Sequence, residues 1–252
     1  GVQKNEIFSV ESDSIRTALY RPYTKTNLYY SQFLNERTYK IPSIFPKKTS
    51  NNRVISICGI GSKGAMTALM VDVTPDIQLM FNSQCFPIFE FEVASENSLF
   101  LSGQSGVVSK TSVSDKFLQY ARNTYPNIQI KSSDIFYYVY GILHSSDYLT
   151  KFANNLSKSL PRIPLVLSEV DFQNIADAGR RLGDLHVNFE TADIFPCQFK
   201  EGDLRLTHIE DPKFFFRVEK MKFAKKGDKS IVIYNKNITI ENIPLEAYGY
   251  VV

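Results

Sequence analysis

The sequence predicts an α+β protein in which mixed or antiparallel β-strands flank a central block of three helices. Three observations support this prediction. Short β-branched segments occupy residues 53–93, apolar residues recur at helical spacing over 133–187, and strand-length segments return beyond Pro196. Strands that stand before and after a helical block, instead of alternating with single helices, are typical of α+β architecture.

The first third of the chain combines an irregular segment with several strands. Residues 7–45 are aromatic and interrupted by prolines, which predicts irregular structure there. The segment from Val54 to Cys58 is β-branched and bounded by Asn52 and Gly59, as a strand should be. The expected strands are 54–58, 65–73, 77–81 and 88–93, with a turn at Pro75-Asp76, and a short helix is expected over 114–123.

Three amphipathic helices are expected between residues 133 and 187. Ser133 is a suitable N-cap for the first, with Asp134 at its positive end. The second helix runs over 148–160, where Pro161 ends it. In the third, Gly179 falls within the apolar stripe and should allow a neighbouring helix to approach closely.

The opposite side of the third helix carries charges. Asp177, Arg180, Arg181 and Asp184 stand at spacings of three and four residues, so pairing within the helix is expected. Beyond Pro196 the chain is β-rich again. Strands are expected at 214–223, 230–234 and 237–240, with a basic hairpin turn at 224–229.

Length and composition limit the class of protein. A chain of 252 residues forms one large or two small domains, and no apolar run is long enough to span a membrane. Cys58, Cys85 and Cys197 are widely spaced, which fits three buried thiols in a reducing cytoplasm and neither a disulfide framework nor a metal site. The start lacks Met and the last residues read as a strand, so we expect an excised piece of a longer protein.

The net charge of +3 is unevenly distributed. Residues 20–64 hold eight Lys or Arg and one acid, and residues 211–230 hold seven bases and three acids. A local positive face is what a polyanion binder requires, because Lys and Arg release counterions where they touch phosphates. The alternative is that these segments are solvated turns.

Motifs for catalysis are weak. The segment from Gly59 to Gly64 reads GxGxxG, but the following residues suit a strand better than the helix of a dinucleotide site. Asp211-Pro212-Lys213-Phe214 resembles the tetrad of amino-methyltransferases, yet Lys213 replaces its second proline. No Walker A motif occurs, and His144 and His186 fit caps near helix ends. We expect no catalytic, cofactor or metal site in this chain.

Several segments in order carry a resemblance that covers residues 20–252. They are Tyr20-Arg21-Pro22-Tyr23, Asn82-Ser83-Gln84-Cys85-Phe86-Pro87, the helical block with Leu160-Pro161-Arg162-Ile163-Pro164 and Ala178-Gly179-Arg180-Arg181-Leu182-Gly183-Asp184-Leu185-His186, and Ile243-Pro244-Leu245-Glu246-Ala247-Tyr248. Together they resemble the C-terminal specificity region of type ISP restriction–modification enzymes. These are single-chain bacterial proteins that join a nuclease, an ATP-driven helicase-type translocase, an adenine methyltransferase and a target recognition domain.

The resemblance implies a target recognition domain over residues 20–252, preceded by a tail of the methyltransferase region over 1–19. It implies that double-stranded DNA and an upstream methyltransferase domain are the partners. S-adenosylmethionine, ATP and Mg are then cofactors of the parent protein and not of this chain. Two alternatives stay open: an S-adenosylmethionine-dependent methyltransferase with its own active site, and a non-catalytic protein-interaction scaffold.

The basic segments supply the candidate DNA contacts. Amide side chains pair with adenine edges and Arg with guanine, which favours a base-reading role for Asn51, Asn52 and Arg53. The expected phosphate contacts are Arg21, Lys25, Lys47, Lys48, Lys63, Lys225, Lys226 and Lys229.

Overall fold

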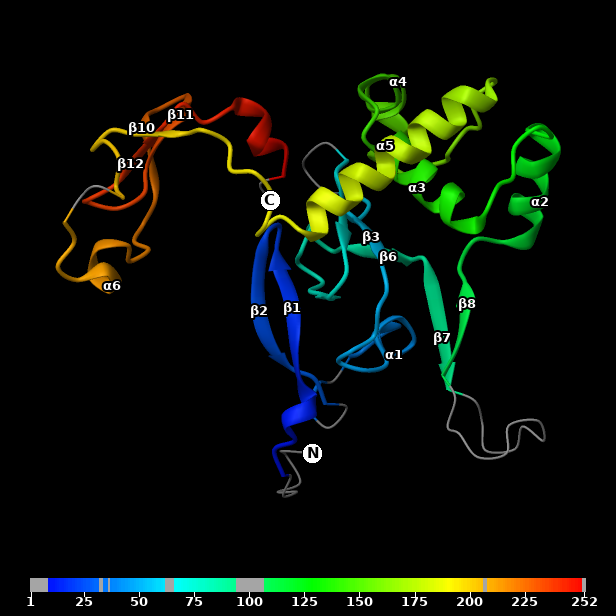
Figure 1. Ribbon diagram of the computed structural model, residues 1–252, viewed down its shortest axis with the longest axis horizontal. Coiled ribbons are helices and arrows are strands. Elements are labelled where there is room, and N and C mark those ends of the chain that lie inside the picture. The colour runs from blue at the N-terminus through cyan, green and yellow to red at the C-terminus, as the bar shows by residue number, and fades with distance from the viewer. Residues whose placement is uncertain are drawn as a thin grey trace. The chain divides into compact units, whose positions relative to one another are not determined.

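The structure is a computed structural model that describes residues 9–31, 34–35, 37–61, 66–93, 107–205 and 208–250. The chain divides into two compact units, of which unit 1 ends at Glu190 and unit 2 begins at Thr191. Both contain strands and helices, which confirms the α+β class (Figure 1). The expected boundary at residue 20 falls inside strand β1 (Ile15–Arg21).

Unit 1 opens with a hairpin where irregular structure was expected. After a short 3-10 turn at Ser12–Ser14, β1 pairs antiparallel with β2 (Thr24–Tyr29), and β5 (Thr74–Pro75) adds to β1 in parallel. The prediction for residues 7–45 is therefore wrong over the hairpin. Pro22, which suggested a break, lies in the hairpin turn, where a proline costs no ladder hydrogen bond.

A second sheet of unit 1 contributes two fully buried strands to the core. Its central strand β3 (Val54–Ile57) pairs antiparallel with β4 (Ala68–Val71) and with β6 (Gln84–Pro87). Every residue of β3 and β4 is buried, as their apolar composition requires. The short helix α1 (Ile41–Ile44) precedes this sheet in the chain.

The strand expected at 77–81 is absent, since these residues form turns. The Asp76 carboxylate accepts a hydrogen bond from the backbone N–H of Gln78 at 2.7 Å, and Phe81 and Asn82 both have positive φ angles. Local side-chain bonds of this kind compete with a strand ladder. Beyond β6, β7 (Phe89–Val93) pairs antiparallel with β8 (Val107–Thr111), and α2 (Asp115–Thr124) follows behind its N-cap Ser114.

The three expected helices are present as α3 (Ser132–Leu143), α4 (Ser146–Leu156) and α5 (Glu169–Val187). Ser133 is not the cap of α3. Helix α3 begins at Ser132 behind the N-cap Lys131, two residues earlier than expected, and the Asp134 carboxylate accepts from the backbone N–H of Lys131 at 2.9 Å. Helix α4 ends at Leu156, before Pro161 is reached.

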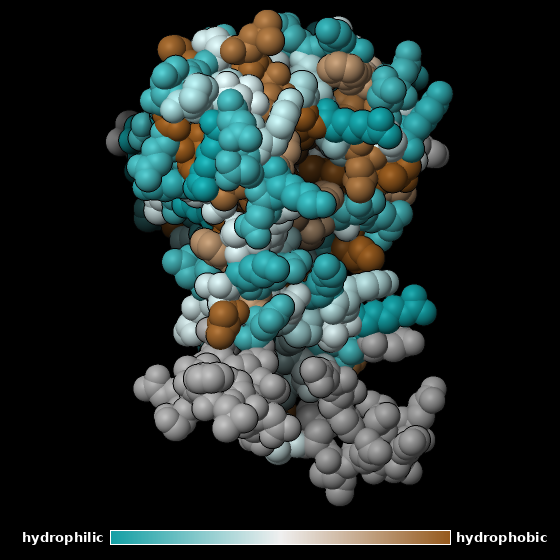
Figure 2. Space-filling view, turned by 90° about the vertical axis from the view of Figure 1, so that its right-hand side faces the viewer, coloured by the Kyte–Doolittle hydropathy of each residue, from teal (hydrophilic) through white to brown (hydrophobic). Residues whose placement is uncertain are grey.

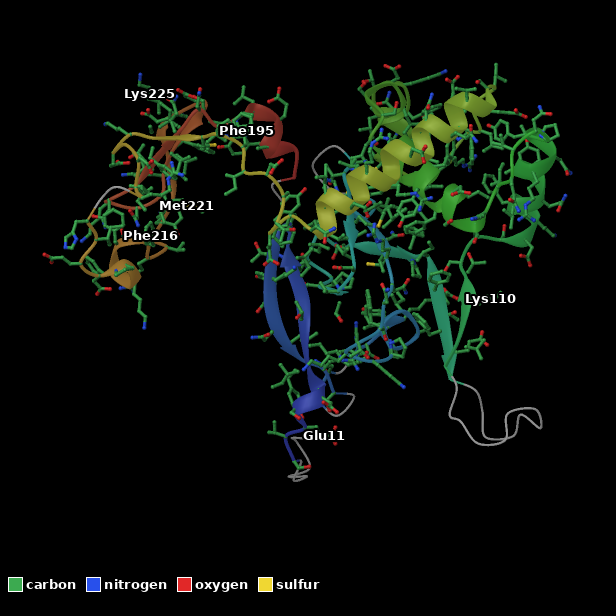
Figure 3. The ribbon with its side chains drawn as sticks, in the orientation of Figure 1. Glu11, Lys110, Phe195, Phe216, Met221 and Lys225 are labelled. Carbon is green, nitrogen blue, oxygen red and sulfur yellow. The ribbon has the colours of Figure 1, made fainter. Side chains whose placement is uncertain are left out.

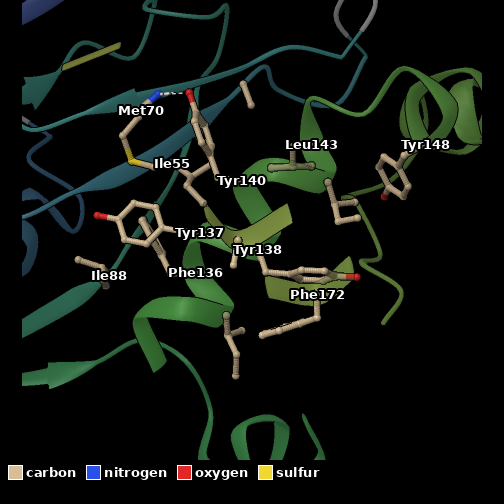
Figure 4. Close-up of a cluster of buried hydrophobic side chains, with 14 of the residues drawn as sticks. Ile55, Met70, Ile88, Phe136, Tyr137, Tyr138, Tyr140, Leu143, Tyr148 and Phe172 are labelled. Carbon is tan, nitrogen blue, oxygen red and sulfur yellow. Dashed lines mark hydrogen bonds between the residues drawn. The ribbon is translucent and has the colours of Figure 1, made fainter. Parts of the chain in front are cut away.

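Buried tyrosines dominate the core between the helices and the sheet (Figure 4). The hydroxyls of Tyr138, Tyr140 and Tyr148 each have a backbone partner. The Tyr140 hydroxyl accepts from the backbone N–H of Met70 at 2.8 Å, the Tyr138 hydroxyl donates to the Pro164 carbonyl at 2.7 Å, and the Tyr148 hydroxyl donates to Arg162. A tyrosine can therefore fill this core without leaving a polar atom unsatisfied.

Helices α3 and α5 pack closely on each other, as the glycine in the third helix predicts. A Cβ atom at Gly179 would lie 2.0 Å from the carbonyl oxygen of Tyr137, so only glycine fits there. Arg180 pairs with Asp134 of α3 at 2.9 Å and lies over the Tyr137 ring. The expected pairing of Arg180 within its own helix is therefore wrong, because the bond crosses to the neighbouring helix.

Unit 2 is built on one antiparallel sheet in the order β10-β11-β12-β9. Its elements are β9 (Gln198–Phe199), α6 (Pro212–Phe215), β10 (Lys222–Lys225), β11 (Asp228–Ile233), β12 (Thr239–Glu241) and a final 3-10 helix at Leu245–Tyr250. The 3-10 helix reaches Tyr250, where the last residues predicted a strand; Val251 and Val252 lie outside the described residues.

The predicted basic hairpin is confirmed, whereas the strand before it is mostly wrong. Lys225 pairs with Asp228 across a two-residue turn, and Gly227 takes the left-handed φ of 89° that this turn needs. The expected strand 214–223 begins only at Lys222. Upstream of it, Asp211 caps α6 and Pro212 occupies the first helical turn, which starts a helix.

Candidate nucleic-acid interface

A hydrogen-bonded loop at residues 46–51, called here the Lys47 loop, presents three of the predicted contact residues. Lys47, Lys48 and Asn51 are exposed on it. The loop closes on itself, because the backbone N–H of Lys47 donates to the Ser50 hydroxyl at 2.9 Å and the N–H of Ser50 donates to the Lys47 carbonyl at 3.0 Å. These two bonds stabilise the turn that presents the exposed side chains.

Arg16 holds the start of this loop. From β1 its guanidinium donates to the carbonyls of Phe45 at 2.7 Å and Pro46 at 3.2 Å, and it lies over the Tyr30 ring. Sequence reasoning missed Arg16, because it is separated from the loop by some thirty residues and belongs to a segment read as irregular. Its role comes from the hairpin β1–β2.

Asn52 holds the other end of the loop and is not placed to read bases. The residue is only 2% exposed. Its amide donates to the carbonyls of Ile44 and Phe89 at 2.9 and 2.8 Å, and its oxygen accepts from the backbone N–H groups of Arg53 and Phe89. An amide with every group engaged in the interior has a structural role.

Arg53 is also committed to an internal contact. Its Nη1 lies 2.5 Å from the Asp184 carboxylate of α5, and its guanidinium lies near the Tyr137 ring. The pair ties β3 to the helical block. Asp184 therefore pairs with Arg53, the residue before β3, whereas the helical spacing predicted a partner on α5 itself.

Two predicted phosphate contacts at the hairpin β1–β2 have partners as well. Arg21 donates to the Gln78 carbonyl at 2.6 Å and lies over the Tyr20 ring. The Lys25 ammonium lies 2.6 Å from the Glu190 carboxylate and above the Phe189 ring. Both would have to exchange these contacts for a phosphate. Lys63 lies outside the described residues.

A groove with a volume of about 750 Å³ opens beside α1, the helix that leads into the Lys47 loop. The hairpin β1–β2 and the segment around β5 and β6 form its other walls. Tyrosines and two cations line it, together with small polar side chains: Tyr20, Tyr30, Tyr39, Arg37, Lys40 and Gln84. Burial raises the pKa of the Tyr30 hydroxyl, although hydrogen bonding to Thr38 opposes this.

The three hairpin cations of unit 2 are all exposed: Lys225, Lys226 and Lys229. Within the described part of the chain none of them forms an ion pair, although Lys229 lies 5.2 Å from the centroid of the Tyr248 ring. The one acid of the turn, Asp228, accepts hydrogen bonds from the backbone N–H and hydroxyl of Ser230. The lysines therefore keep their charge available.

Other surfaces differ from these basic ones. Figure 2 shows apolar and hydrophilic side chains alternating over the helical side of unit 1. Among the residues that the structure describes, no three His, Cys, Asp or Glu gather into a metal site.

Burial raises the pKa of the Cys85 thiol to about 11, so this cysteine is a poor nucleophile at neutral pH.

The two motifs that hinted at methyltransferase chemistry have structural roles. Gly59 and Gly61 stand between β3 and β4, which pair antiparallel, whereas a dinucleotide site needs a strand followed by a helix; residues 62–65 lie outside the described part of the chain. The Asp211 carboxylate accepts a hydrogen bond from the backbone N–H of Phe214 and so caps α6. Neither supports the alternative of an S-adenosylmethionine site, which a cofactor titration would test directly.

The histidines near the helix ends bind backbone and tyrosine groups. His144, at the C-terminus of α3, contacts the carbonyls of Tyr140 and Ala68 at 2.9 and 3.2 Å. His186 contacts the Tyr140 hydroxyl. Both are largely buried, and burial lowers the pKa of each, that of His186 to about 4.

The chain matches a family model described as the type ISP C-terminal specificity domain, over residues 2–252. No curated protein matches it. No helix among the described residues is long and apolar enough to cross a membrane.

Three solved structures are similar over nearly the whole chain. The first is a nuclease-deletion mutant of the type ISP restriction–modification enzyme LlaGI in complex with a DNA substrate mimic, with 35% identity, a TM-score of 0.71 and coverage of 98% of this chain and 20% of that one. The ATP-dependent type ISP restriction–modification enzyme LlaBIII bound to DNA has 31% identity, a TM-score of 0.77 and coverage of 99% and 15%. A cryo-EM DrdV–DNA complex has 29% identity, a TM-score of 0.77 and coverage of 98% and 23%. The chain therefore spans less than a quarter of the length of each of these proteins.

Proposed function

The chain belongs to the family of type ISP C-terminal specificity domains, and from this premise we propose that it recognises a short site in double-stranded DNA. The observation that carries the proposal is the similarity, along almost the entire chain, to three proteins whose structures were solved with DNA or a DNA mimic. The exposed, unpaired lysines of both units support it, because phosphate contacts need such charges.

The Lys47 loop is the proposed reading element of unit 1. Lys47 and Lys48 would contact phosphates, and Asn51 would present its amide to a base edge. Arg16 and Asn52 fix the loop from inside the fold, and a contact held in this way loses little conformational entropy when DNA binds. Asn52 would act through this support and not by touching bases, and Arg53 would act through its pairing with Asp184.

The remaining candidates are proposed as phosphate contacts of different weight. Lys225, Lys226 and Lys229 are unpaired on a short turn and suit the DNA backbone. Arg21 and Lys25 would contribute less, since each already has a hydrogen-bond or ion-pair partner. Lys63 is proposed as a phosphate contact only because it is a cation within the basic segment 20–64.

We further propose that the chain works within a longer bacterial restriction–modification polypeptide in the cytoplasm. An adenine methyltransferase domain upstream would be its partner and would use S-adenosylmethionine. A nuclease and a translocase that use Mg and ATP would complete the parent enzyme. The support is the family and the small share of the similar proteins that this chain covers.

Affinity measurements on the Lys47 loop test the proposed function. The double variant Lys47→Ala/Lys48→Ala should weaken binding to all duplexes alike and lower the salt slope by roughly two units, because two phosphate contacts are lost. Asn51→Ala should leave the salt slope unchanged and cost about 1–3 kcal/mol only on sequences that the chain prefers.

The measurement is the affinity of the 252-residue chain for a duplex library at several salt concentrations, with bound sequences read out. Lys158→Ala, an exposed lysine just beyond α4, is the matched control and should behave as wild type. Absence of any salt-dependent binding by the wild-type chain would contradict the proposed function.

A further inference from the structure

An exposed strip of alternating apolar and basic residues in unit 2 stands out against the rest of the described surface. The strip comprises residues 216–223 and is called here the Phe216 strip. Four of its eight residues are apolar and exposed by 43–65%: Phe216, Val218, Met221 and Phe223. Three others are cations, namely Arg217, Lys220 and Lys222, and one is an acid, Glu219.

Hydrogen bonds from Asn235 and Tyr234 hold the start of the strip in place. Asn235, which is 6% exposed, donates through its amide to the carbonyls of Phe215 at 2.8 Å and Arg217 at 3.0 Å. The Tyr234 hydroxyl donates to the Phe216 carbonyl at 3.1 Å. The fold thus uses one of its few buried polar residues to fix a segment whose side chains face solvent.

The far end of the strip is fixed by the sheet. Lys222 pairs with Ile233 and Phe223 with Val232 in the β10–β11 ladder. The ring of Tyr248 supports Phe223 from the side, with centroids 5.8 Å apart. Figure 3 shows Phe216, Met221 and Lys225 following one another along this part of unit 2.

The composition of the strip indicates which macromolecule covers it. Exposed apolar side chains in a held segment mark a binding surface. Protein interfaces are depleted in lysine at their cores, whereas this strip carries cations between its apolar residues and leads into Lys225 and Lys226. In the described part of the chain none of the three strip cations forms an ion pair. A nucleic acid fits this pattern, because its bases have apolar faces and its phosphates carry the negative charges.

We propose that the Phe216 strip is a second DNA-contacting surface, on which apolar side chains touch bases while the flanking cations lie on phosphates. Proteins that place Phe or Met against bases in this way unstack the step that they contact. The inference rests on the proposed function, since it requires that the chain bind DNA. This second surface would respond to how easily a base step of the DNA unstacks. It would not read the hydrogen-bonding groups on the base edges.

The test separates apolar from ionic contacts in the 252-residue chain. Met221→Ala and Phe216→Ala should each weaken binding to short duplexes about tenfold, as expected for a lost base contact, with the salt slope unchanged. Lys222→Ala should lower the salt slope by about one unit. Duplexes that carry 2-aminopurine should gain fluorescence with the wild-type chain and less with the two apolar variants.

Two controls make the outcomes distinct. Leu167→Ala removes a fully exposed apolar side chain from unit 1 and should change neither affinity nor fluorescence. Thermal unfolding of the strip variants should match wild type, because the replaced side chains are exposed. Wild-type affinity and fluorescence in Met221→Ala and Phe216→Ala would overturn the inference and leave the proposed function standing. Failure of the wild-type chain to bind DNA would overturn the proposed function as well.

Discussion

At the scale of single residues, Asn52 supports the Lys47 loop through four hydrogen bonds in the interior. Asn52→Ala would leave the carbonyls of Ile44 and Phe89 and two backbone N–H groups without their partner. A buried group left unsatisfied costs about 1–3 kcal/mol, so we expect a loss of roughly 3 kcal/mol or more in the free energy of unfolding.

Denaturant titration measures this loss. Asn51→Ala, a change of the exposed neighbour, is the matched control and should stay within about 0.5 kcal/mol of wild type. Equal stability of the two variants would mean that the interior bonds of Asn52 contribute nothing and that its role must be sought at the surface.

His186 gives the fold a specific sensitivity to acid. Its pKa is lowered to about 4 by burial and by the nearby His144, from an ordinary value of 6.5. The unfolded chain therefore binds the proton more readily, so the contribution of His186 to stability is complete above pH 6.5 and is lost as the pH falls toward 4. At most about 3 kcal/mol depends on this residue.

Comparison of variants isolates that contribution from the titration of the carboxylates. The stability of His186→Gln should fall less steeply than that of wild type between pH 6.5 and pH 4, measured by chemical denaturation. His208→Gln, at an exposed histidine, is the control for the substitution itself. Parallel curves for wild type and His186→Gln would contradict the prediction.

Residue type alone did not predict which side chains of the basic segment lie in the interior. Asn52 and Arg53 were selected because amides and guanidiniums read bases, yet Asn52 is buried and holds the Lys47 loop, and Arg53 pairs with Asp184 of α5. The direction of a side chain depends on tertiary partners such as Ile44 and Asp184, which a single sequence does not identify. Lysines on turns were predictable, because a hydrated ammonium group has no reason to turn inward.

At the scale of elements, the crossing of α3 and α5 depends on Gly179. In Gly179→Ala the new Cβ would lie 2.0 Å from the Tyr137 carbonyl oxygen, so the helices must separate. The better helix propensity of alanine offsets only about 1 kcal/mol. We expect a net loss of roughly 3 kcal/mol or more in the free energy of unfolding, measured by denaturant titration.

Gly183→Ala is the matched control on the same helix. There the added Cβ would meet the end of the flexible Met70 side chain at 3.2 Å, which can move aside. Its stability should stay within about 1 kcal/mol of wild type. If both variants were equally stable, the close approach at Gly179 would not determine the packing of α3 on α5.

Helices were easier to predict than strands for a physical reason. The stripes of α3 and α5 repeat over several turns, so their period was clear even though the caps and ends were shifted by a few residues. Segments 77–81 and 214–223 have apolar, β-prone side chains, but Asp76 and Asp211 redirect the backbone with local hydrogen bonds. Such capping outweighs β propensity in short segments.

At the scale of the whole molecule, the two units differ in how much they bury. Unit 1 holds a continuous core of apolar and tyrosine side chains. In the described part of unit 2, only Asn235 and Ile238 are buried. The sequence did not reveal this division, because apolar residues are as frequent around Phe214–Phe223 as in the core segments, and only the structure shows that they are exposed.

Local stability follows buried apolar contact, so the backbone amides of unit 2 should exchange hydrogen much sooner than those of α3, α5 and β3 in the free chain. A ligand that binds a folded segment raises its stability by mass action. Addition of duplex DNA should therefore slow exchange most in β10, β11 and the Phe216 strip, and also in the Lys47 loop. Hydrogen–deuterium exchange read by mass spectrometry measures both effects. Protection confined to the Lys47 loop would limit the DNA interface to unit 1, whereas slow exchange throughout unit 2 without DNA would show that its few buried residues suffice to hold it.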